Sequence, residues 1–217
     1  VVPEFNCRVW DIDISDEVAA IQDPLGNAVH TAFATCLSAK TVLITGMGPI
    51  GLCAIKVAKA AGATAVFVTD LSEYRLDLAR KLGADLAINP KLEEPVAAIR
   101  AVTDGMGADV LLEMAGAPTA IRQGLQALRK AGFAALLGIP SAPLEIDLAR
   151  DVIFRSLTLQ GINGRRMFDT WYKSRALLKA GLDVSPVITH RLSLWEGFHE
   201  GMELMMEGKC GKVILIP

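Results

Sequence analysis

Three closely spaced glycines constrain the fold of this 217-residue chain more than any other feature. Residues 46–51 read Gly-Met-Gly-Pro-Ile-Gly, and they directly follow a short apolar run, residues 41–45, that is typical of a buried strand. Pro49 suits the first turn of a helix, because an N–H group there would have no partner within the helix, and residues 50–61 are expected to form that helix. The pattern predicts a strand, a tight glycine turn and a helix in succession.

A second apolar run, residues 65–69, ends in Asp70, nineteen residues after Gly51. Together the two runs, the glycine turn and the acid form the pattern of a dinucleotide-binding unit. In that unit Gly46 makes the tight turn, Gly48 lets the backbone approach the pyrophosphate, and Gly51 lets helix and strand pack closely. Asp70 is predicted to accept from the ribose hydroxyls and to repel a 2′-phosphate, which favours NAD over NADP. A chance glycine-rich turn and a solvated acid are the alternatives.

Strand and helix patterns alternate along the chain, which predicts a parallel sheet with helical crossovers. The fold class predicted is α/β, a doubly wound six-stranded Rossmann sheet in the order 3-2-1-4-5-6. Its strands are expected at residues 41–45, 65–69, 86–88, 109–113, 133–137 and 157–162. Helices are expected at residues 23–39, 50–61, 72–82, 93–102, 119–128, 168–179 and 194–206. A last apolar run, residues 212–216, predicts a terminal strand that needs a partner sheet, and residues 1–10 hardly supply one.

Composition argues against several classes of protein. The chain has 22 Lys and Arg against 24 Asp and Glu, so neither a nucleic-acid partner nor an anionic membrane surface is predicted. No apolar run reaches the roughly 18 residues of a membrane span. The four cysteines stand far apart without a Cys-x-x-Cys pair, which predicts free thiols in a reducing compartment, the cytoplasm.

Several segments together resemble the medium-chain zinc alcohol dehydrogenases, and within that family the threonine dehydrogenases. They are residues 23–30 (Asp-Pro-Leu-Gly-Asn-Ala-Val-His), 46–51, 69–70, 74–75 (Tyr-Arg), 137–140 (Leu-Gly-Ile-Pro), 161–165 (Gly-Ile-Asn-Gly-Arg), 167–172, 187–190 and 211–215. The resemblance covers essentially the whole chain. It implies hydride transfer from the secondary alcohol of L-threonine to NAD, giving 2-amino-3-oxobutanoate, with zinc polarising the alcohol oxygen in a complete enzyme.

The resemblance also implies a division of the chain. Members of that family begin with a GroES-like β domain that supplies the zinc ligands, and its pattern is not found here. Residues 1–22 are expected to be the end of that catalytic domain, residues 23–166 the NAD-binding domain, and residues 167–217 helices and a strand returning to the catalytic domain. The three histidines, His30, His190 and His199, stand apart in the sequence and offer no zinc trio, so no metal ligand is predicted. A truncated chain that binds NAD without turning over substrate is expected.

Further cofactor-binding residues follow from the resemblance. Arg75 is expected to lie over the adenine, with a solvated surface arginine as the alternative. Ile50, at the start of the phosphate-binding helix, is expected to contact the cofactor as well as the core. The ends of the fifth and sixth strands are expected to flank the nicotinamide, because ligands of open α/β sheets bind at the carboxyl ends of strands. These residues are Leu137, Gly138, Ile139, Ile162 and Asn163.

Asp23 is the residue predicted to be catalytic. In the resembling enzymes an acid at this position lies beside the zinc, as a fourth ligand or a proton-relay group, whereas its chemistry alone suits a helix N-cap. His30 lies two turns further along the same helix face and is expected to be a hydrogen-bonded helix residue rather than a base.

Other functions and assemblies stay open at this stage. A non-catalytic NAD-binding or sensor module and a dehydrogenase of another polyol or alcohol fit the same pattern. A methyltransferase also uses a glycine-rich first turn, but the spacing of the third glycine argues against it. Relatives in the family suggest a homo-oligomer in which the sixth strand, residues 157–162, pairs with its copy.

Overall fold

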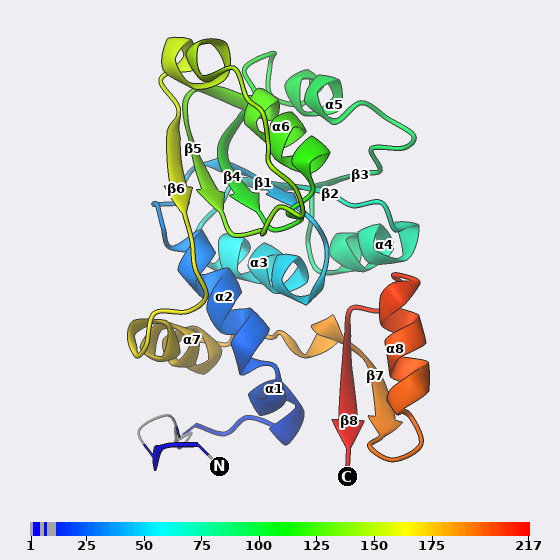
Figure 1. Cartoon of the computed structure of the whole chain (residues 1–217). Coiled ribbons are helices and arrows are strands. Elements are labelled where there is room, and N and C mark those ends of the chain that lie inside the picture. Colours follow the sequence, from blue (N-terminus) through cyan, green and yellow to red (C-terminus); the bar gives the residue numbers. More distant parts are fainter. Residues whose placement is uncertain (1, 5–6, 8–11) are drawn as a thin grey trace.

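A six-stranded parallel sheet forms the centre of the computed structural model, which describes residues 2–4, 7 and 12–217 (Figure 1). Its order is β3-β2-β1-β4-β5-β6, so the predicted doubly wound α/β fold and the predicted strand order are both confirmed. The strands are β1 (Thr41–Thr45), β2 (Ala65–Thr69), β3 (Leu86–Ile88), β4 (Ala108–Glu113), β5 (Leu128–Leu136) and β6 (Thr158–Gly161).

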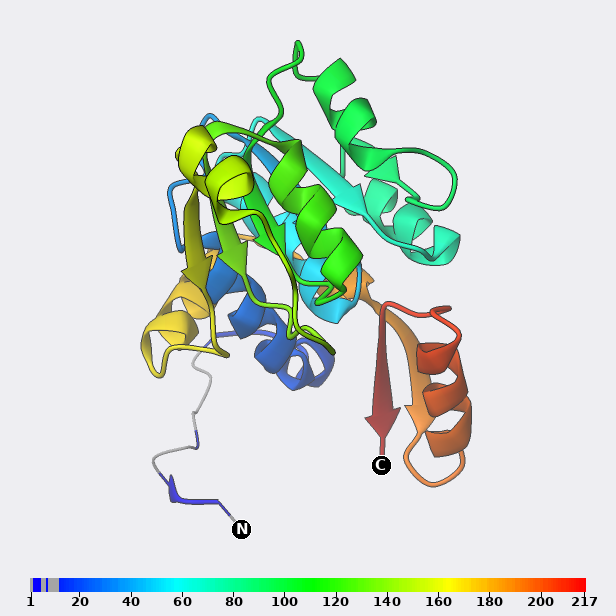
Figure 2. The same cartoon turned by 45° about the horizontal axis from the view of Figure 1, so that its top comes forward.

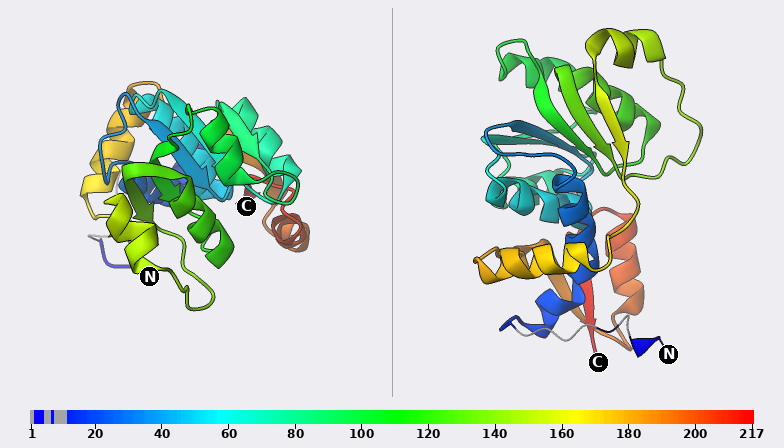
Figure 3. Two further views of the ribbon diagram at one scale, coloured as in Figure 1. Left: turned by 90° about the horizontal axis from the view of Figure 1, so that it is seen from above. Right: turned by 90° about the vertical axis from the view of Figure 1, so that its left-hand side faces the viewer.

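Helices lie on both sides of this sheet (Figure 3), because successive side chains of each strand face two different apolar cores. Val42 and Ile44 of β1 belong to one core, whereas Leu43 between them belongs to the other. The first core packs against α2, α3 and α4, and the second against α5 and α6. These helices are α2 (Gln22–Ala32), α3 (Pro49–Ala60), α4 (Glu73–Lys81), α5 (Pro95–Ala101) and α6 (Pro118–Ala127).

Three predicted boundaries are wrong by four residues or more. The helix expected over residues 194–206 begins only at Phe198, because the Leu194 N–H still donates to the Ile216 carbonyl oxygen of the terminal strand. The helix expected over residues 23–39 ends at Ala32, because Leu37 is buried in the core and Ala39 takes a left-handed φ of 59° before β1 begins. Strand β5 begins earlier than predicted, since an irregular pairing with β4 extends it back to the end of α6.

Shorter elements connect the sheet to the rest of the chain. They are α1 (Asp16–Ala20), η2 (Leu148–Val152), η3 (Ile153–Arg155), α7 (Asp169–Lys179) and η4 (Ser185–Val187). Of these only α7 matches a predicted helix. The segment predicted to end a catalytic domain, residues 1–22, lies partly outside the described residues, and its assignment stays a prediction. Within the described ranges, no helix combines the length and the apolar character that crossing a membrane requires.

A small second sheet lies beside the large one (Figure 2), and residues 188–216, which form it, are called the C-terminal unit below. Its elements are β7 (Ile188–Ser193), α8 (Phe198–Met206) and β8 (Lys212–Ile216). The predicted terminal strand does have a partner, but the partner is β7, in parallel, and not residues 1–10. The sequence analysis missed β7 because the polar residues 189–191 interrupt its apolar pattern.

Candidate dinucleotide-binding site

The glycine turn after β1 has the geometry that its spacing predicts. Gly46 has a φ of +85°, and a Cβ on it would lie 2.8 Å from the Cα of Ala115. A Cβ on Gly51 would lie 1.9 Å from the Gly46 carbonyl oxygen, so a side chain there would force α3 away from the turn. Gly48 differs from both, because no atom lies within 4 Å of its added Cβ. The turn is therefore tight at its two ends and open in its middle.

Helix α3 begins at this open position. Its N-cap is Gly48, which offers no side-chain hydrogen bond, and Pro49 occupies the first turn. The first N–H groups of the helix therefore have no side-chain cap, and they carry the positive end of the helix dipole. Such a terminus is a binding site for phosphate groups.

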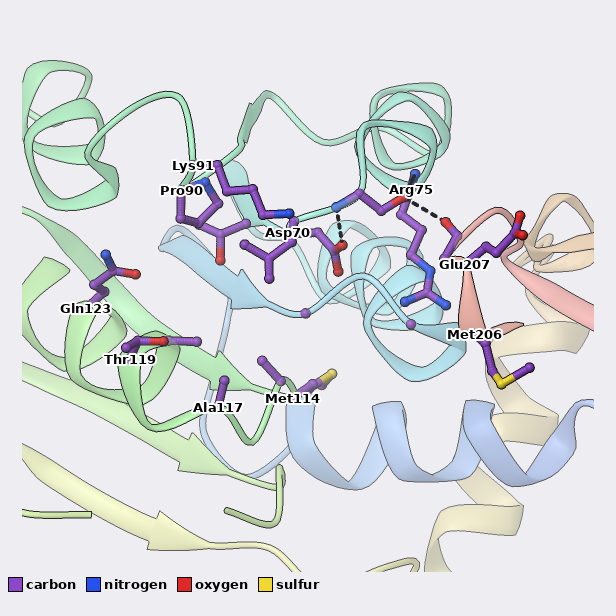
Figure 4. A pocket seen from close by; sticks show the side chains of 18 residues that line it. Asp70, Arg75, Pro90, Lys91, Met114, Ala117, Thr119, Gln123, Met206 and Glu207 are labelled. Carbon is purple, nitrogen blue, oxygen red and sulfur yellow. Dashed lines mark hydrogen bonds between the residues drawn. The ribbon is translucent and has the colours of Figure 1, made fainter. Parts of the chain in front are cut away.

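A cavity of about 550 Å³ lies at the carboxyl edge of the sheet in front of this turn. Its walls come from the ends of β1, β2 and β4, the loop after β3, helix α6 and the end of α8. Figure 4 shows Asp70 and Lys91 across the cavity from Ala117. Carboxyl ends of parallel strands are where open α/β sheets bind ligands, so the position of the cavity agrees with the predicted site.

Asp70 joins the glycine turn to the start of α4. Its Oδ2 accepts from the Met47 N–H at 2.6 Å, and its Oδ1 accepts from the Ser72 N–H at 2.8 Å. The Ser72 hydroxyl in turn donates to the Gly208 carbonyl oxygen at 2.7 Å, beyond the end of α8. The predicted ribose acceptor is thus fixed at the cavity by two backbone donors.

Arg75 lines the same cavity from the first turn of α4. Its Nε donates to the Cys210 carbonyl oxygen at 3.1 Å, so the C-terminal unit holds the guanidinium in place. Met206, Glu207 and Gly208 complete the wall on this side. These three residues and Lys91 were not predicted to belong to the site, because they lie far from the glycine turn in the sequence and carry no local signal.

The other predicted cofactor residues are not among the described residues that line this cavity. Ile50 and Gly51 both belong to the first turn of α3. Ile50 is half-buried against the first core, and Gly51 is buried. Ile139 is 89 % exposed, Ile162 is buried in the first core, and Asn163 is exposed.

Leu137 and Gly138 lie just after β5, and their N–H groups donate to the Glu113 carbonyl oxygen at 2.9 and 3.1 Å. They therefore join the carboxyl ends of β4 and β5. The structure brings Gly46, Gly48, Asp70 and Arg75 together in one cavity, and the residues assigned to the nicotinamide side lie outside it.

Glu113 is a buried carboxyl group at the end of β4 that the sequence analysis treated only as part of a strand. Its Oε1 accepts from the N–H groups of Ala115 and Gly116, both at 2.9 Å, and from the Thr45 hydroxyl at 3.2 Å. Burial raises the pKa of Glu113 above its usual value, since these donors only partly offset the loss of water. The sequence signal that could have identified Glu113 as a site residue is an acid at the end of an otherwise apolar strand.

Asp23 lies in the first turn of α2, and the N-cap of that helix is Ile21. The helix-cap role is therefore wrong, because α1 runs into α2 through Ile21 and places Asp23 inside the helix. Its Oδ1 pairs with the Arg165 Nε at 3.1 Å. The His30 Nδ1 lies 2.7 Å from the Gly164 carbonyl oxygen, as expected for a hydrogen-bonded helix histidine. Both side chains hold the loop after β6.

The described part of the chain contains no group of three or more His, Cys, Asp or Glu side chains that could hold a metal ion. The residues present there do not fit a zinc site. The cysteines are free thiols, as predicted.

Comparison with known proteins places this geometry in a family. Residues 49–180 match the family model described as zinc-binding dehydrogenase. An L-threonine 3-dehydrogenase of Symbiobacterium thermophilum is 56 % identical over all of this chain and 62 % of its own length. One of Caldanaerobacter subterraneus is 49 % identical over the same shares. The chain thus spans about 62 % of the length of the curated relatives it matches.

Solved structures agree with this assignment. The alcohol dehydrogenase TADH from Thermus sp. ATN1 superposes with a TM-score of 0.88 at 30 % identity, covering 97 % of this chain and 61 % of that one. The 2R,3R-butanediol dehydrogenase from Bacillus subtilis superposes with a TM-score of 0.85 at 30 % identity, covering 100 % of this chain and 60 % of that one. Since the family model matches more than half of its residues, the chain belongs to the zinc-binding dehydrogenases, a medium-chain zinc-dependent family.

Proposed function

We propose that the chain is the NAD-binding part of a dehydrogenase that oxidises the secondary alcohol of L-threonine to 2-amino-3-oxobutanoate. The proposed binding of NAD rests on one observation. The Asp70 carboxylate lines the cavity and accepts from the glycine turn that precedes α3. The substrate half is supported by relatives named L-threonine 3-dehydrogenase, which match the chain over its full length.

The residues at the cavity fit NAD. The open position at Gly48 leaves room for a pyrophosphate against the backbone, and the uncapped N–H groups of α3 suit its charge. Both Asp70 and Arg75 line the cavity, and we propose that Asp70 accepts from the ribose hydroxyls and that Arg75 lies against the adenine. When bound, NAD supplies the hydride acceptor, and the chain's own part is to orient it and to exclude water.

Cofactor choice is the sharpest test of this half. Asp70 disfavours a 2′-phosphate, whereas the cations Arg75 and Lys91 in the same cavity would favour one. Because the Arg75 guanidinium already donates to the Cys210 carbonyl oxygen of the C-terminal unit, we propose that the charge of Asp70 sets the cofactor preference and that NAD binds more tightly than NADP. Calorimetric titration of the chain with NAD and with NADP measures the preference. Equal or tighter binding of NADP would contradict the proposal.

Catalysis is proposed to need a zinc-ligand domain in addition to this chain. We expect the 217-residue chain, supplied with zinc, NAD and L-threonine, to produce no NADH above a blank. Turnover by the chain itself would overturn this part of the proposal. A protein of the relatives' full length is expected to be active with zinc.

Asp23 is proposed to take a proton in that longer protein. Asn at this position keeps the shape but can neither take a proton nor carry charge, so Asp23→Asn is expected to lower kcat at nearly unchanged NAD affinity. The matched control is Asp169→Asn, an exposed acid in the first turn of α7 that pairs with Lys173. Full activity of Asp23→Asn would contradict the proton-transfer role and leave Asp23 with only its ion pair to Arg165.

A second substrate class is favoured by one observation. The butanediol dehydrogenase superposes along the whole chain, so a diol or other small alcohol is the competing substrate. A non-catalytic NAD-binding module is the remaining alternative. Activity of the longer protein with L-threonine and with 2,3-butanediol separates the three, since a module without activity would oxidise neither.

We further propose a homo-oligomer that forms through β6, in the cytoplasm. Strand β6 lies at one edge of the large sheet, and the apolar side chains of Leu148, Ile153 and Phe154 are exposed in the segment that precedes it. Pairing of two β6 edges would cover unpaired backbone groups and join two sheets. Sedimentation of the chain is expected to give a dimer or larger species, and a monomer at high concentration would contradict this.

A further inference from the structure

We propose that Glu113 is a positioning residue of the cofactor site, which holds the turn after β4 against the glycine turn so that the pyrophosphate half of NAD meets a preformed backbone. The inference rests on the proposed NAD binding. It goes beyond that function because Glu113 itself does not line the cavity.

One residue joins the carboxyl ends of three strands here. The Glu113 side chain accepts from Ala115 and Gly116 in its own turn and from Thr45 at the end of β1. Its backbone carbonyl accepts from the two N–H groups that follow β5. Loss of the side chain would leave the N–H groups of the exposed Ala115 and the buried Gly116, and the Thr45 hydroxyl, without their acceptor, which frees the turn to move.

The turn that Glu113 holds is the immediate neighbour of the glycine turn. A Cβ on Gly46 would lie 2.8 Å from the Cα and 2.9 Å from the N of Ala115, so the two backbones are in direct contact. On its other side, a Cβ on Gly116 would lie 2.7 Å from the Ile139 carbonyl oxygen. Any shift of residues 114–116 is therefore transmitted to the phosphate-binding turn and to the loop after β5.

The surroundings of Glu113 argue for positioning rather than for stability. The residue is 0 % exposed, and its Oε2 is buried without a hydrogen-bond partner in the described structure. A Cβ on Gly138 would lie 2.5 Å from that oxygen, so only glycine leaves it room. Burial of a carboxyl group destabilises a fold unless its bonds compensate, so a group held this way contributes through the geometry it fixes.

The test compares two ligands on three variants of the chain. AMP carries one phosphate and lacks the pyrophosphate that is proposed to meet the glycine turn, so its binding depends less on that turn than the binding of NAD does. Glu113→Ala is expected to raise the Kd for NAD about tenfold, by loss of hydrogen bonds to a carboxyl group, and to change the Kd for AMP less than about twofold. Glu113→Gln keeps a carbonyl acceptor and is expected to stay within about threefold of the parent for NAD.

Asp109→Ala is the matched control, because it removes a carboxylate from the other end of the same strand. It is expected to lower the Tm while leaving the Kd for NAD within about twofold, since its partners lie away from the cavity. Titrations are made by calorimetry well below each variant's Tm. If Glu113→Ala does not fold, Glu113→Leu, which keeps most of the side-chain volume but has no acceptor for the turn N–H groups, replaces it with the same expectation.

Four results would overturn the inference: unchanged NAD binding in Glu113→Ala, equal weakening of NAD and AMP, no rescue by Gln, or equal weakening by Asp109→Ala. Failure of the parent chain to bind NAD would instead defeat the proposed function. The two failures are therefore distinguishable in the same set of titrations.

Discussion

Strand β4 carries a carboxyl group near each of its ends, and the two edges of the sheet hold them differently. At the amino edge, Asp109 accepts from the Thr41 N–H and hydroxyl, each at 2.8 Å, and pairs with Arg129 at 2.5 Å. At the carboxyl edge, Glu113 accepts only from neutral donors. The Asp109 network thus includes a charged partner, Arg129, whereas these donors to the Glu113 side chain are all neutral.

The pKa shifts of the two groups have opposite signs. Burial acts to raise the pKa of Asp109, but the hydrogen bonds from Thr41 and Arg129 outweigh it and lower that pKa below its usual value. For Glu113 burial prevails and the pKa rises. The amino edge therefore binds the strands together with satisfied charges, whereas the carboxyl edge gives up stability to hold its turns in fixed positions around a ligand cavity.

The largest expected effect compares glycines at the two edges. Gly51→Ala places a Cβ 1.9 Å from the Gly46 carbonyl oxygen, and Gly107→Ala, just before β4, places one 2.4 Å from the Ala127 carbonyl oxygen at a φ of +98°. Overpacking is expected to destabilise each by about 3 kcal/mol. Only Gly51→Ala is expected to abolish NAD binding by the folded protein. Denaturant unfolding measures the stability of both variants and titration measures their NAD affinity. Loss of NAD binding in Gly107→Ala would contradict a ligand-binding role confined to the carboxyl edge.

Removal of the amino-edge carboxylate should act on stability alone. Asp109→Ala takes the acceptor from Thr41 and the partner from Arg129, and is expected to lower the free energy of unfolding by about 2–3 kcal/mol. Asp77→Ala, which breaks an exposed pair with Arg80, is the control and should change it by less than about 0.5 kcal/mol. Urea unfolding checks both values. A similar loss in the two variants would show that the network at this edge is unimportant.

At the carboxyl edge, Asp70→Ala is expected to act on ligand binding. Loss of a charged hydrogen-bond acceptor is expected to weaken NAD binding by about 2 kcal/mol. The preference over NADP should narrow, because the cations Arg75 and Lys91 remain in the cavity. Calorimetry with both cofactors measures these changes. The control is Glu73→Ala, which removes an exposed carboxylate that accepts from the Asn89 side chain, and it should leave both affinities unchanged. An undiminished preference for NAD in Asp70→Ala would exclude Asp70 as its source.

The smallest effect is on the pH dependence of stability. Because the pKa of Asp109 is lowered on folding, its contribution is present above the unfolded value of 3.8 and is lost as the pH falls through the folded value. Glu113, with a raised pKa, contributes below 4.5 and loses that contribution as the pH rises through its folded value. In a plot of the free energy of unfolding against pH, Asp109→Asn should reduce the loss of stability at acid pH. Glu113→Gln should reduce the loss of stability as the pH rises above 4.5. Unfolding free energies across pH check this, and unchanged curves would contradict it.

Much of the fold was predictable because the relevant signals are local. An apolar run such as residues 41–45 is buried on both faces of the sheet, and a glycine with positive φ marks a turn wherever it occurs. The polar strand β7 was missed for the converse reason. It is half-exposed and forms only because β8 pairs with it, so its own pattern is weak.

The candidate site divides in the same way. The strand order, the glycine turn and the acid at the end of β2 follow from local sequence, since spacing and backbone conformation suffice for these. The contacts of Ser72 and Arg75 with Gly208 and Cys210, the link of Glu113 between three strand ends, and the pair between Asp23 in α2 and Arg165 in the loop after β6 depend on the packed fold. These contacts join residues up to 142 positions apart, and packing of whole elements, rather than any local preference of the chain, brings such residues together.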